Sequence, residues 1–384
     1  MRHRRITKVQ RYSAALMAFV LFVLIRASAP VAALTLERIE LPAGFSISLF
    51  ATGVRNARQL TSGAEGIVYV GTRRAGVVYA VVDEDGDYRA DHVYTIADGL
   101  YMPSGVAYRD GILYVAEVNR ILAFDDVDKN LESPPKPRVV FEQLPRGSYH
   151  GWKFIEFGPD GKLYVPVGAP CNVCNVEDPY GTILRVDVDN GSMEIVARGV
   201  RNSVGFAWHP LTNELWFTDN GRDMMGDDIP PGELNRVTRS DQHFGFPYIH
   251  GGDISDPKFG VNARLEDYTK PALKLGAHVA PLGPLFYTGK LFPQEYQFDL
   301  LIAEHGSWNR SRKSGYRIMR AHFDKHGDIS SYEPFATGWL VGEENWGRPV
   351  DLEQLPDGSI LVSDDDAGVL YRISYGQAAG EMTK

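Results

Sequence analysis

Histidine and arginine residues occur at two points of the chain where their side chains suit catalysis on a bound group. His150, in Tyr-His-Gly-Trp at 149–152, stands just before an apolar segment. An unperturbed imidazole titrates near neutral pH, so His150 suits a general base. Arg201 and Asn202 lie in Gly-Val-Arg-Asn-Ser at 199–203, and an arginine there can stabilise negative charge that develops on a ligand. A structural histidine and a surface ion pair are the alternative interpretations.

An acidic segment follows a little further along, at 219–228, where aspartates and glycines alternate in an irregular loop. Carboxylate and backbone carbonyl oxygens are the ligands that calcium prefers. The spacing does not match an EF-hand loop, and a solvated acidic loop without metal explains the same composition. The segment therefore indicates a calcium site only in combination with other observations.

Basic side chains gather in the last quarter of the chain. His305, Arg310 and Lys313 belong to Glu-His-Gly-Ser-Trp-Asn-Arg-Ser-Arg-Lys at 304–313, and Arg348 belongs to Trp-Gly-Arg at 346–348. In an acidic protein, a local cluster of positive charge suits a small polyanionic ligand.

The elements that must position these residues are short repeated strands. An apolar strand, a Gly or Asp/Asn turn and a second β-rich strand recur six times. The first strands of the copies lie at 66–70, 111–115, 161–165, 213–217, 298–302 and 358–362. The first three glycines are 45 and 50 residues apart, which is typical of four-stranded propeller blades. The sequence therefore predicts an all-β fold, a six-bladed β-propeller with long loops on the active-site face.

A propeller makes two further expectations specific. The strand at 45–50 should pair with the strand near 370–375 and close the ring, and the long gap at 241–288 should form loops that cover one face. Equivalent positions of different blades meet at one end of the central channel. We therefore expect His150, Arg201, the 219–228 loop, His305 and Arg348 to face one pocket.

The first 33 residues are typical of a secretory signal peptide. A basic segment precedes the apolar run at 14–25, and Val31-Ala32-Ala33 fits a cleavage site. An uncleaved N-terminal anchor is the alternative. We therefore expect a periplasmic or secreted protein with a propeller catalytic domain at 34–384 and no integral membrane domain after cleavage.

Charge and cysteine content exclude several classes of partner. The formal net charge of −9 becomes −15 when the six basic residues of the leader are removed, which argues against nucleic acid and anionic membranes. The two cysteines, in Cys171-Asn-Val-Cys174, lack the histidine that a c-type haem motif requires at 175. A local disulfide and two reduced thiols both remain open for an exported protein.

At these motifs the chain resembles the soluble quinoprotein sugar dehydrogenases, the glucose/sorbosone dehydrogenase family, and within it the sorbosone-dehydrogenase-like proteins. The resemblance runs from about 41 to 375. It is carried by Tyr-His-Gly-Trp-Lys-Phe (149–154), Gly-Pro-Asp-Gly-Lys-Leu-Tyr-Val (158–165), Gly-Val-Arg-Asn-Ser-Val-Gly (199–205), Phe-Thr-Asp-Asn-Gly-Arg-Asp (217–223), Glu-His-Gly-Ser-Trp-Asn-Arg (304–310) and Trp-Gly-Arg-Pro-Val-Asp (346–351). It implies a propeller that binds pyrroloquinoline quinone (PQQ) and Ca²⁺, oxidises a sugar or sugar-aldehyde hydroxyl and passes electrons to an external acceptor.

The resemblance also implies roles for individual residues. His150 matches the base that takes the hydroxyl proton, and Arg201 stabilises negative charge on the reduced quinone. The expected cofactor-binding set is His150, Arg201, Asn202, His305, Arg310 and Arg348. Gly221 and Arg222 match the pair whose backbone carbonyls bind the calcium that polarises the quinone.

Three positions depart from the glucose-type members of that family. Ala169 stands where they carry a carboxylate that orients the base, so another group must orient His150. Arg222 replaces a proline in the calcium-binding pair. Trp346 replaces a second arginine, and we expect Arg310 or Lys313 to supply the missing charge.

Two other functions fit parts of the same pattern. A calcium-dependent propeller lactonase or hydrolase would use the 219–228 acids directly as metal ligands and need no quinone. A non-catalytic carbohydrate-binding propeller would bind a ligand without turnover.

Overall fold

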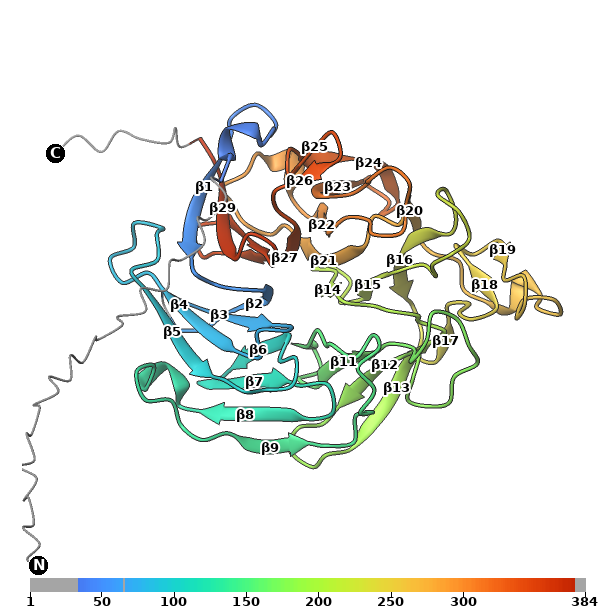
Figure 1. Ribbon diagram of the computed structural model, residues 1–384, viewed down its shortest axis with the longest axis horizontal. Helices are drawn as coiled ribbons and strands as arrows, with labels where there is room; N and C mark the ends of the chain where they lie inside the picture. The colour runs from blue at the N-terminus through green and yellow to red at the C-terminus, as the bar shows by residue number, and fades with distance from the viewer. Residues whose placement is uncertain (1–33, 65, 377–384) are drawn as a thin grey trace, which may run out of the picture. The chain divides into compact units, whose positions relative to one another are not determined.

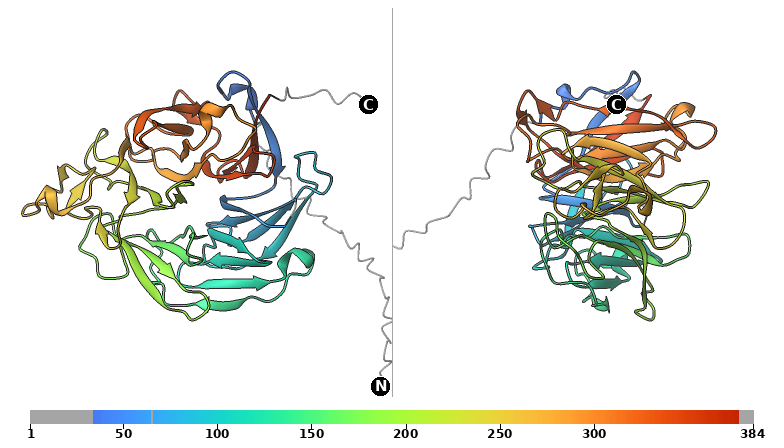
Figure 2. Two further views of the ribbon diagram at one scale, coloured as in Figure 1. Left: turned by 180° about the vertical axis from the view of Figure 1, so that it is seen from behind. Right: turned by 90° about the vertical axis from the view of Figure 1, so that its right-hand side faces the viewer.

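The computed structural model describes residues 34–64 and 66–376, and the signal peptide predicted at 1–33 lies outside the described residues. The described chain forms six blades around a central axis, five of them four-stranded antiparallel sheets and one a five-stranded sheet with a short parallel strand added to its outer edge (Figures 1 and 2). This arrangement confirms the all-β, six-bladed propeller predicted from the repeats.

The blades follow one another in chain order, and the first strand of each lies innermost. The first blade consists of β2 (Ala57–Ser62), β3 (Ile67–Thr72), β4 (Val78–Val82) and β5 (His92–Ala97), and the second of β6 (Gly105–Arg109), β7 (Ile112–Ala116), β8 (Ile121–Asp125) and β9 (Arg138–Phe141). The third consists of β10 (Glu156–Phe157), β11 (Leu163–Val167), β12 (Thr182–Val186) and β13 (Met193–Arg198), with β17 (Gln242–His243) added parallel to β13. The fourth blade consists of β14 (Phe206–Trp208), β15 (Leu215–Asp219), β16 (Pro231–Val237) and β20 (Leu273–Ala277), and the fifth of β21 (Pro281–Phe286), β22 (Leu300–Glu304), β23 (Arg317–Phe323) and β24 (Ile329–Ala336). The sixth consists of β27 (Pro349–Gln354), β28 (Ile360–Asp364), β29 (Val369–Tyr375) and β1 (Phe45–Thr52).

Only short elements lie outside the blades. Two hairpins are formed by β18 (Ile249–His250) with β19 (Ile254–Ser255), and by β25 (Leu340–Val341) with β26 (Glu344–Asn345). Four 3-10 turns are η1 (Leu36–Arg38), η2 (Val127–Lys129), η3 (Leu265–Asp267) and η4 (Gln294–Tyr296). The described segments include no helix with the length and hydropathy needed to span a bilayer.

The ring closes as predicted, through a strand from each end of the described chain. Strand β1 pairs antiparallel with β29, and Phe45 lies opposite Tyr375 (Figure 1, blue beside red). The Phe45 ring packs edge-on against Phe292, with centroids 4.7 Å apart, so the closing strand is also fixed to the fifth blade. Because β1 supplies the outer strand of the sixth blade, β29 is not left as an unpaired sheet edge.

The hydrophobic core lies between neighbouring blades. All six residues of β3 are buried, because each of its faces packs on an adjacent sheet. Tyr69 of the first blade shares one cluster with Val106 and Leu113 of the second. Burying an aliphatic side chain of this size contributes about 1.5–3 kcal/mol, so the repeated interfaces hold the blades and their loops in fixed positions.

One sequence expectation needs correction. The segment 241–288, expected to form loops that cover one face, instead contains the outer strand β20 and the inner strand β21. Its β18–β19 hairpin lies at the outer edge of the ring (Figure 1). The segment still reaches the channel, because Ala280, Pro281 and Leu282 line the central cavity.

Candidate active site

A cavity of about 400 Å³ lies at one end of the central channel. Its walls are rich in arginine, histidine and aromatic side chains that come from loops of different blades. The lining residues are Arg58, Arg73, Tyr149, His150, Trp152, Arg201, Asn202, Val204, Asn220, Gly221, Asp223, Gly232, His278, Ala280, Pro281, Leu282, His305, Gly306, Trp308, Asn309 and Arg348. A mixed polar and aromatic cavity of this size is typical of a small-molecule site.

The cavity unites most of the residues that the sequence singled out. Six of the eight line it: His150, Arg201, Asn202, Gly221, His305 and Arg348. They are spread over nearly 200 positions of the chain and come together because the blades circle one axis. Arg222 and Arg310 are not among the lining residues.

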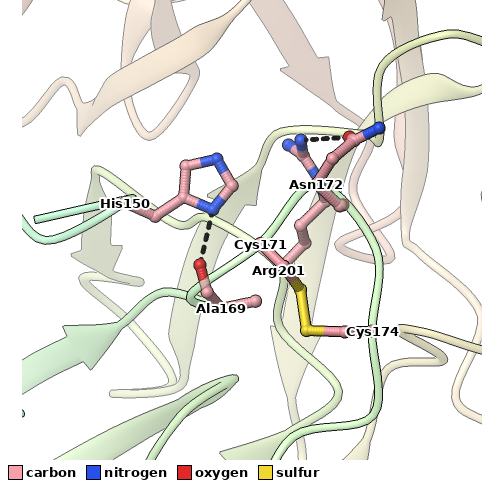
Figure 3. Close-up of a disulfide and its surroundings, with 6 residues drawn as sticks. All are labelled: His150, Ala169, Cys171, Asn172, Cys174 and Arg201. Carbon is pink, nitrogen blue, oxygen red and sulfur yellow. Dashed lines mark hydrogen bonds between the residues drawn. A yellow bond between two sulfur atoms is a disulfide. The ribbon is translucent and has the colours of Figure 1, made fainter. Parts of the chain in front are cut away.

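His150 is held by the backbone of the β11–β12 loop (Figure 3). Its Nδ1 lies 2.9 Å from the carbonyl oxygen of Ala169. A carbonyl can only accept, so Nδ1 carries the proton and Nε2 carries the free lone pair. Gly168 permits this contact, because a Cβ there would lie 2.6 Å from the Cβ of His150. The position expected to lack an orienting carboxylate thus orients the imidazole through its main chain.

The surroundings of His150 favour its neutral form. Burial, the nearby Arg201 guanidinium and, more weakly, Arg73 lower the pKa of His150 from 6.5 to about 3, although the hydrogen bond to Ala169 opposes the shift. The rings of Tyr149 and Trp152 lie edge-on to the imidazole, with centroids 4.5 and 6.1 Å away. His150 is therefore an unprotonated, oriented imidazole at neutral pH.

Arg201 is buried, and four of its five guanidinium N–H groups donate to neighbouring loops. Asn172 accepts two hydrogen bonds from it, one at its carbonyl oxygen and one at Oδ1, both 2.9 Å long (Figure 3). The carbonyl oxygen of Asn220 (3.1 Å) and the carboxylate of Asp223 (3.0 Å) accept the others. Asn172 lies between Cys171 and Cys174, which are joined by a disulfide, so the covalently closed loop supports the arginine.

Asp219 shapes the turn that carries Arg201 and Asn202. Its carboxylate accepts the backbone N–H of Arg201 (2.8 Å) and of Asn202 (2.6 Å). Burial raises the pKa of Asp219 to about 6, and these two backbone hydrogen bonds act against the rise. Asp219 therefore has a structural role at the end of β15.

Arg348 and His305 are coupled on the opposite side of the site. The guanidinium of Arg348 donates to the carbonyl oxygens of His305 (3.1 Å) and Gly306 (2.8 Å). His305 Nε2 lies 2.7 Å from the carboxylate of Asp365, which also accepts Nη1 of Arg58 at 2.9 Å. Burial lowers the pKa of His305 to about 4, and despite burial the His305 and Arg58 contacts lower that of Asp365.

Three basic residues expected at the site have other partners. Arg310 donates to the backbone carbonyl of Asp227 (2.6 Å) and to the carboxylate of Asp228 (3.1 Å). The neighbouring acidic loop thus accepts hydrogen bonds from its guanidinium, and Arg310 does not line the cavity. Lys313 donates to the side chain of Asn345 (2.7 Å) and is not a lining residue, so it does not supply that charge to the cavity either. The Arg222 side chain pairs with Asp256 and leaves only its main chain for a ligand.

The acidic loop does not gather its carboxylates around one point. Asp223 pairs with Arg201, Asp227 with Ser311 and Asp228 with Arg310. Within the described chain, the carboxylates that do lie close together are Asp83, Asp85 and Asp91, in the β4–β5 loop away from the cavity lining. By contrast, the carbonyl oxygens of Gly221 and Arg222 accept no hydrogen bond from any described residue.

Sequence reasoning missed Arg58, Arg73, Trp152 and Asn172. Arg73 follows the end of β3 and lies over the indole of Trp152, with its guanidinium carbon 3.6 Å from the ring centroid. Equivalent positions of different blades were expected to meet, and Arg73 follows β3 as His305 follows β22, so extending that expectation to the first blade identifies Arg73. Arg58 lies in an inner strand and gave no motif signal.

Comparison with known families agrees with this geometry. A family model described as Glucose / Sorbosone dehydrogenase matches residues 115–372, about two thirds of the chain. A protein of Borreliella burgdorferi described as uncharacterized is 36% identical over 351 residues, which cover 88% of this chain and 91% of that protein. A pyrroloquinoline quinone-dependent pyranose dehydrogenase of Coprinopsis cinerea is 30% identical over 147 residues, 33% of this chain and 19% of that enzyme.

Solved structures share the fold at low sequence identity. The calcium structure of a Trichoderma reesei Carbohydrate-Active Enzymes Family AA12 protein aligns with a TM-score of 0.77 and 20% identity, covering 88% of this chain and 97% of that one. The holo form of the pyranose dehydrogenase PQQ domain from Coprinopsis cinerea aligns with a TM-score of 0.74 and 17% identity over the same shares.

Proposed function

Because the chain belongs to the glucose/sorbosone dehydrogenase family, we propose that it is an exported, PQQ-dependent dehydrogenase that oxidises a hydroxyl group of a sugar or sugar aldehyde. The observation that carries this proposal is the oriented, neutral imidazole of His150 in a cavity lined by four arginines. PQQ is an anionic, planar molecule, and such a cavity suits it.

The charges of the cavity support a polyanionic cofactor. The guanidinium groups of Arg58 and Arg201 are neutralised by Asp365 and Asp223. Within the described chain, the guanidinium of Arg348 donates hydrogen bonds only to backbone carbonyls and lies over the ring of Tyr316, and Arg73 has a buried Nε without any acceptor. Two uncompensated positive charges in one cavity fit the carboxylates of a quinone. Arg201, Asn202 and Arg348 are the residues that would hold it.

The donor set also fits calcium. Calcium takes oxygen ligands, including backbone carbonyls. Gly221 lines the cavity, and the carbonyls of Gly221 and Arg222 have no protein donor among the described residues. These two carbonyls would hold the ion, whose charge would polarise the bound quinone.

His150 supplies the protein's part of the chemistry. When bound, PQQ accepts the hydride equivalent that leaves the substrate carbon. Nε2 of His150 accepts the proton of the reacting hydroxyl. It is the ring nitrogen with the free lone pair, because Nδ1 carries the ring proton and donates it to the carbonyl oxygen of Ala169. Arg201 places a fixed, buried positive charge beside the site, which stabilises negative charge as it develops.

The rim of the cavity suits a carbohydrate. Tyr149 and Trp308 are 47% and 71% exposed, and both line the cavity. Exposed aromatic rings beside a polar cavity are typical of a ligand-binding groove. We propose a sugar as the substrate class, with sorbosone-type and aldose-type compounds as the first candidates.

A disulfide supports export. Cys171 and Cys174 are joined, and such bonds persist in oxidising compartments such as the periplasm or the extracellular space. Together with the leader predicted at 1–33, this bond supports a periplasmic or secreted protein.

The calcium-dependent hydrolase is disfavoured by the pairing of the 219–228 acids with protein groups, since none is free to form a carboxylate metal site there. The experiment that separates the functions is dye-linked oxidation of a panel of sugars by protein reconstituted with PQQ and Ca²⁺. We expect turnover that depends on PQQ and disappears in His150→Ala. Hydrolysis of lactones without PQQ, or sugar binding without turnover, would favour the alternatives.

A further inference from the structure

We propose that Arg73 is a carboxylate-binding residue of the cavity, and that Trp152 holds its guanidinium flat for this purpose. Neither residue belongs to the set predicted from the family motifs. The proposal concerns the chemistry of the ligand group, a carboxylate. The carboxylate has two candidate sources, the quinone of the proposed function and an acidic sugar substrate.

Arg73 differs from the other arginines that line the cavity. Arg58, Arg201 and Arg348 each donate to acceptors of the protein. The guanidinium of Arg73 has no hydrogen-bond acceptor and no ion pair within the described chain, and its Nε is buried. A charged donor that is withdrawn from water and left unpaired destabilises a protein. The unpaired guanidinium of Arg73 therefore indicates that a bound ligand supplies the missing hydrogen-bond acceptors.

The charged neighbours of Arg73 are mostly positive, so they repel its guanidinium and do not neutralise it. Its closest charged neighbours include Arg58, Arg74 and Arg348, and only Asp365 acts in the opposite direction. Burial and these positive charges lower the pKa of Arg73 to about 10, so it remains charged at neutral pH. An incoming carboxylate relieves both the missing hydrogen bonds and the repulsion.

Trp152 fixes the direction in which Arg73 can bind. The guanidinium carbon lies 3.6 Å from the indole centroid, so the group is stacked on the ring. Its N–H groups lie in the guanidinium plane and remain free to donate to a ligand. A stacked guanidinium binds a carboxylate through two parallel N–H groups. Trp152 also contacts the ring of His150, which places this anion subsite beside the base.

Calorimetry on the full-length apoprotein tests the proposal with citrate, D-galacturonate and PQQ as probes and D-galactose as a neutral control. We expect Arg73→Gln to weaken at least one of the three carboxylate ligands about tenfold to a hundredfold and leave galactose unchanged. Arg73→Lys, which keeps the charge without the fork, should lie between. The matched control is Arg74→Gln, because Arg74 is the exposed neighbour outside the cavity and should behave like the parent.

The ligands identify the source of the carboxylate. If Arg73→Gln weakens the binding of PQQ alone, the subsite binds a carboxylate of the cofactor, and this conclusion rests on the proposed function. If it weakens galacturonate and leaves PQQ unchanged, the subsite selects acidic sugars. If the parent protein does not bind PQQ, the proposed function fails, and the citrate and galacturonate affinities still decide the role of Arg73.

Two results would overturn the proposal. The first is unchanged affinity of Arg73→Gln for all three carboxylate ligands. The second is a melting temperature of apo Arg73→Gln several degrees below the parent, because removal of an unpaired, partly buried charge should leave the apoprotein at least as stable. A marked loss of stability would give Arg73 a structural role.

Discussion

The imidazole Nδ1 of His150 lies 2.9 Å from the carbonyl oxygen of Ala169, the residue at the position that was expected from the sequence to lack an orienting carboxylate. A backbone carbonyl fixes the same tautomer that a carboxylate would, because both only accept. It carries no full negative charge, so it raises the basicity of the ring less. The imidazole is thus oriented, and the hydrogen bond to Ala169 offsets only part of the lowering of its pKa by burial.

Displacement of His150 should therefore reduce catalysis more than cofactor binding. A Cβ on Gly168 would lie 2.6 Å from the Cβ of His150 and 2.8 Å from its carbonyl oxygen. We expect Gly168→Ala to lower kcat by about tenfold to a hundredfold, since a shift of about 1 Å of a catalytic group has effects of this size. Steady-state kinetics with a PQQ titration checks this. Gly191→Ala, at a position outside the cavity lining with φ +72° and no atom within 4 Å of an added Cβ, measures the effect of backbone strain alone. Unchanged kcat in Gly168→Ala would contradict the assigned role.

The pH dependence of stability should carry a contribution from His150. Its pKa is lowered from 6.5 to about 3, chiefly by burial, so between these values the unfolded chain binds a proton that the folded protein does not. This contribution to stability is present above pH 6.5 and is lost as the pH falls toward 3. We expect the melting temperature of His150→Gln to fall less than that of the parent between pH 7 and pH 5. An identical fall in both proteins would argue against a neutral, buried imidazole.

Asn172 should act on the site through Arg201. Its Oδ1 accepts Nη2 of Arg201 at 2.9 Å and the backbone N–H of Asp223 at 2.8 Å. We expect Asn172→Ala to lower the stability by about 1–3 kcal/mol, because a buried charged donor loses an acceptor, and to weaken PQQ binding. Asn172→Asp, which retains both acceptors, should restore most of the affinity. Denaturant unfolding measures the change in stability, and titration with PQQ measures the change in affinity. Parent-like PQQ affinity in Asn172→Ala would show that the disulfide loop does not contribute to cofactor binding.

The exposed ring of Trp308 should bind the sugar and have little effect on the cofactor. It is 71% exposed and lines the cavity. We expect Trp308→Ala to raise KM for the sugar several-fold with a small change in kcat, and Trp308→Phe to behave much like the parent. The check is a comparison of KM and kcat for these variants. An equal loss in kcat with unchanged KM would place the ring at the reacting atoms.

Sequence reasoning reached the fold because the evidence for it is periodic and local. Each copy of the repeat carries its own turn and apolar strand, and the pairing of Phe45 with Tyr375 follows from closing a ring. The site required contacts that repeats do not encode. Asp365, from the sixth blade, binds both His305 and Arg58 from two other blades, and neither partner predicts the other.

Arg310 shows that a local signal does not reveal the partner of a charge. Its place in the cation-rich segment at 304–313 suggested a cofactor ligand, but its guanidinium donates to Asp227 and Asp228, and it is not among the lining residues of the cavity. Charge clusters in a sequence show which groups are available, and only the arrangement of loops decides which of them are already paired.

Titration of the purified apoprotein with PQQ in the presence of Ca²⁺ tests the central claim most directly, with binding followed by quenching of tryptophan fluorescence. We predict saturation at one quinone per chain and a clear loss of affinity in Arg348→Gln, whose guanidinium in the parent faces the cavity without a carboxylate partner. Absence of saturable quinone binding by the correctly folded parent protein would contradict the assignment.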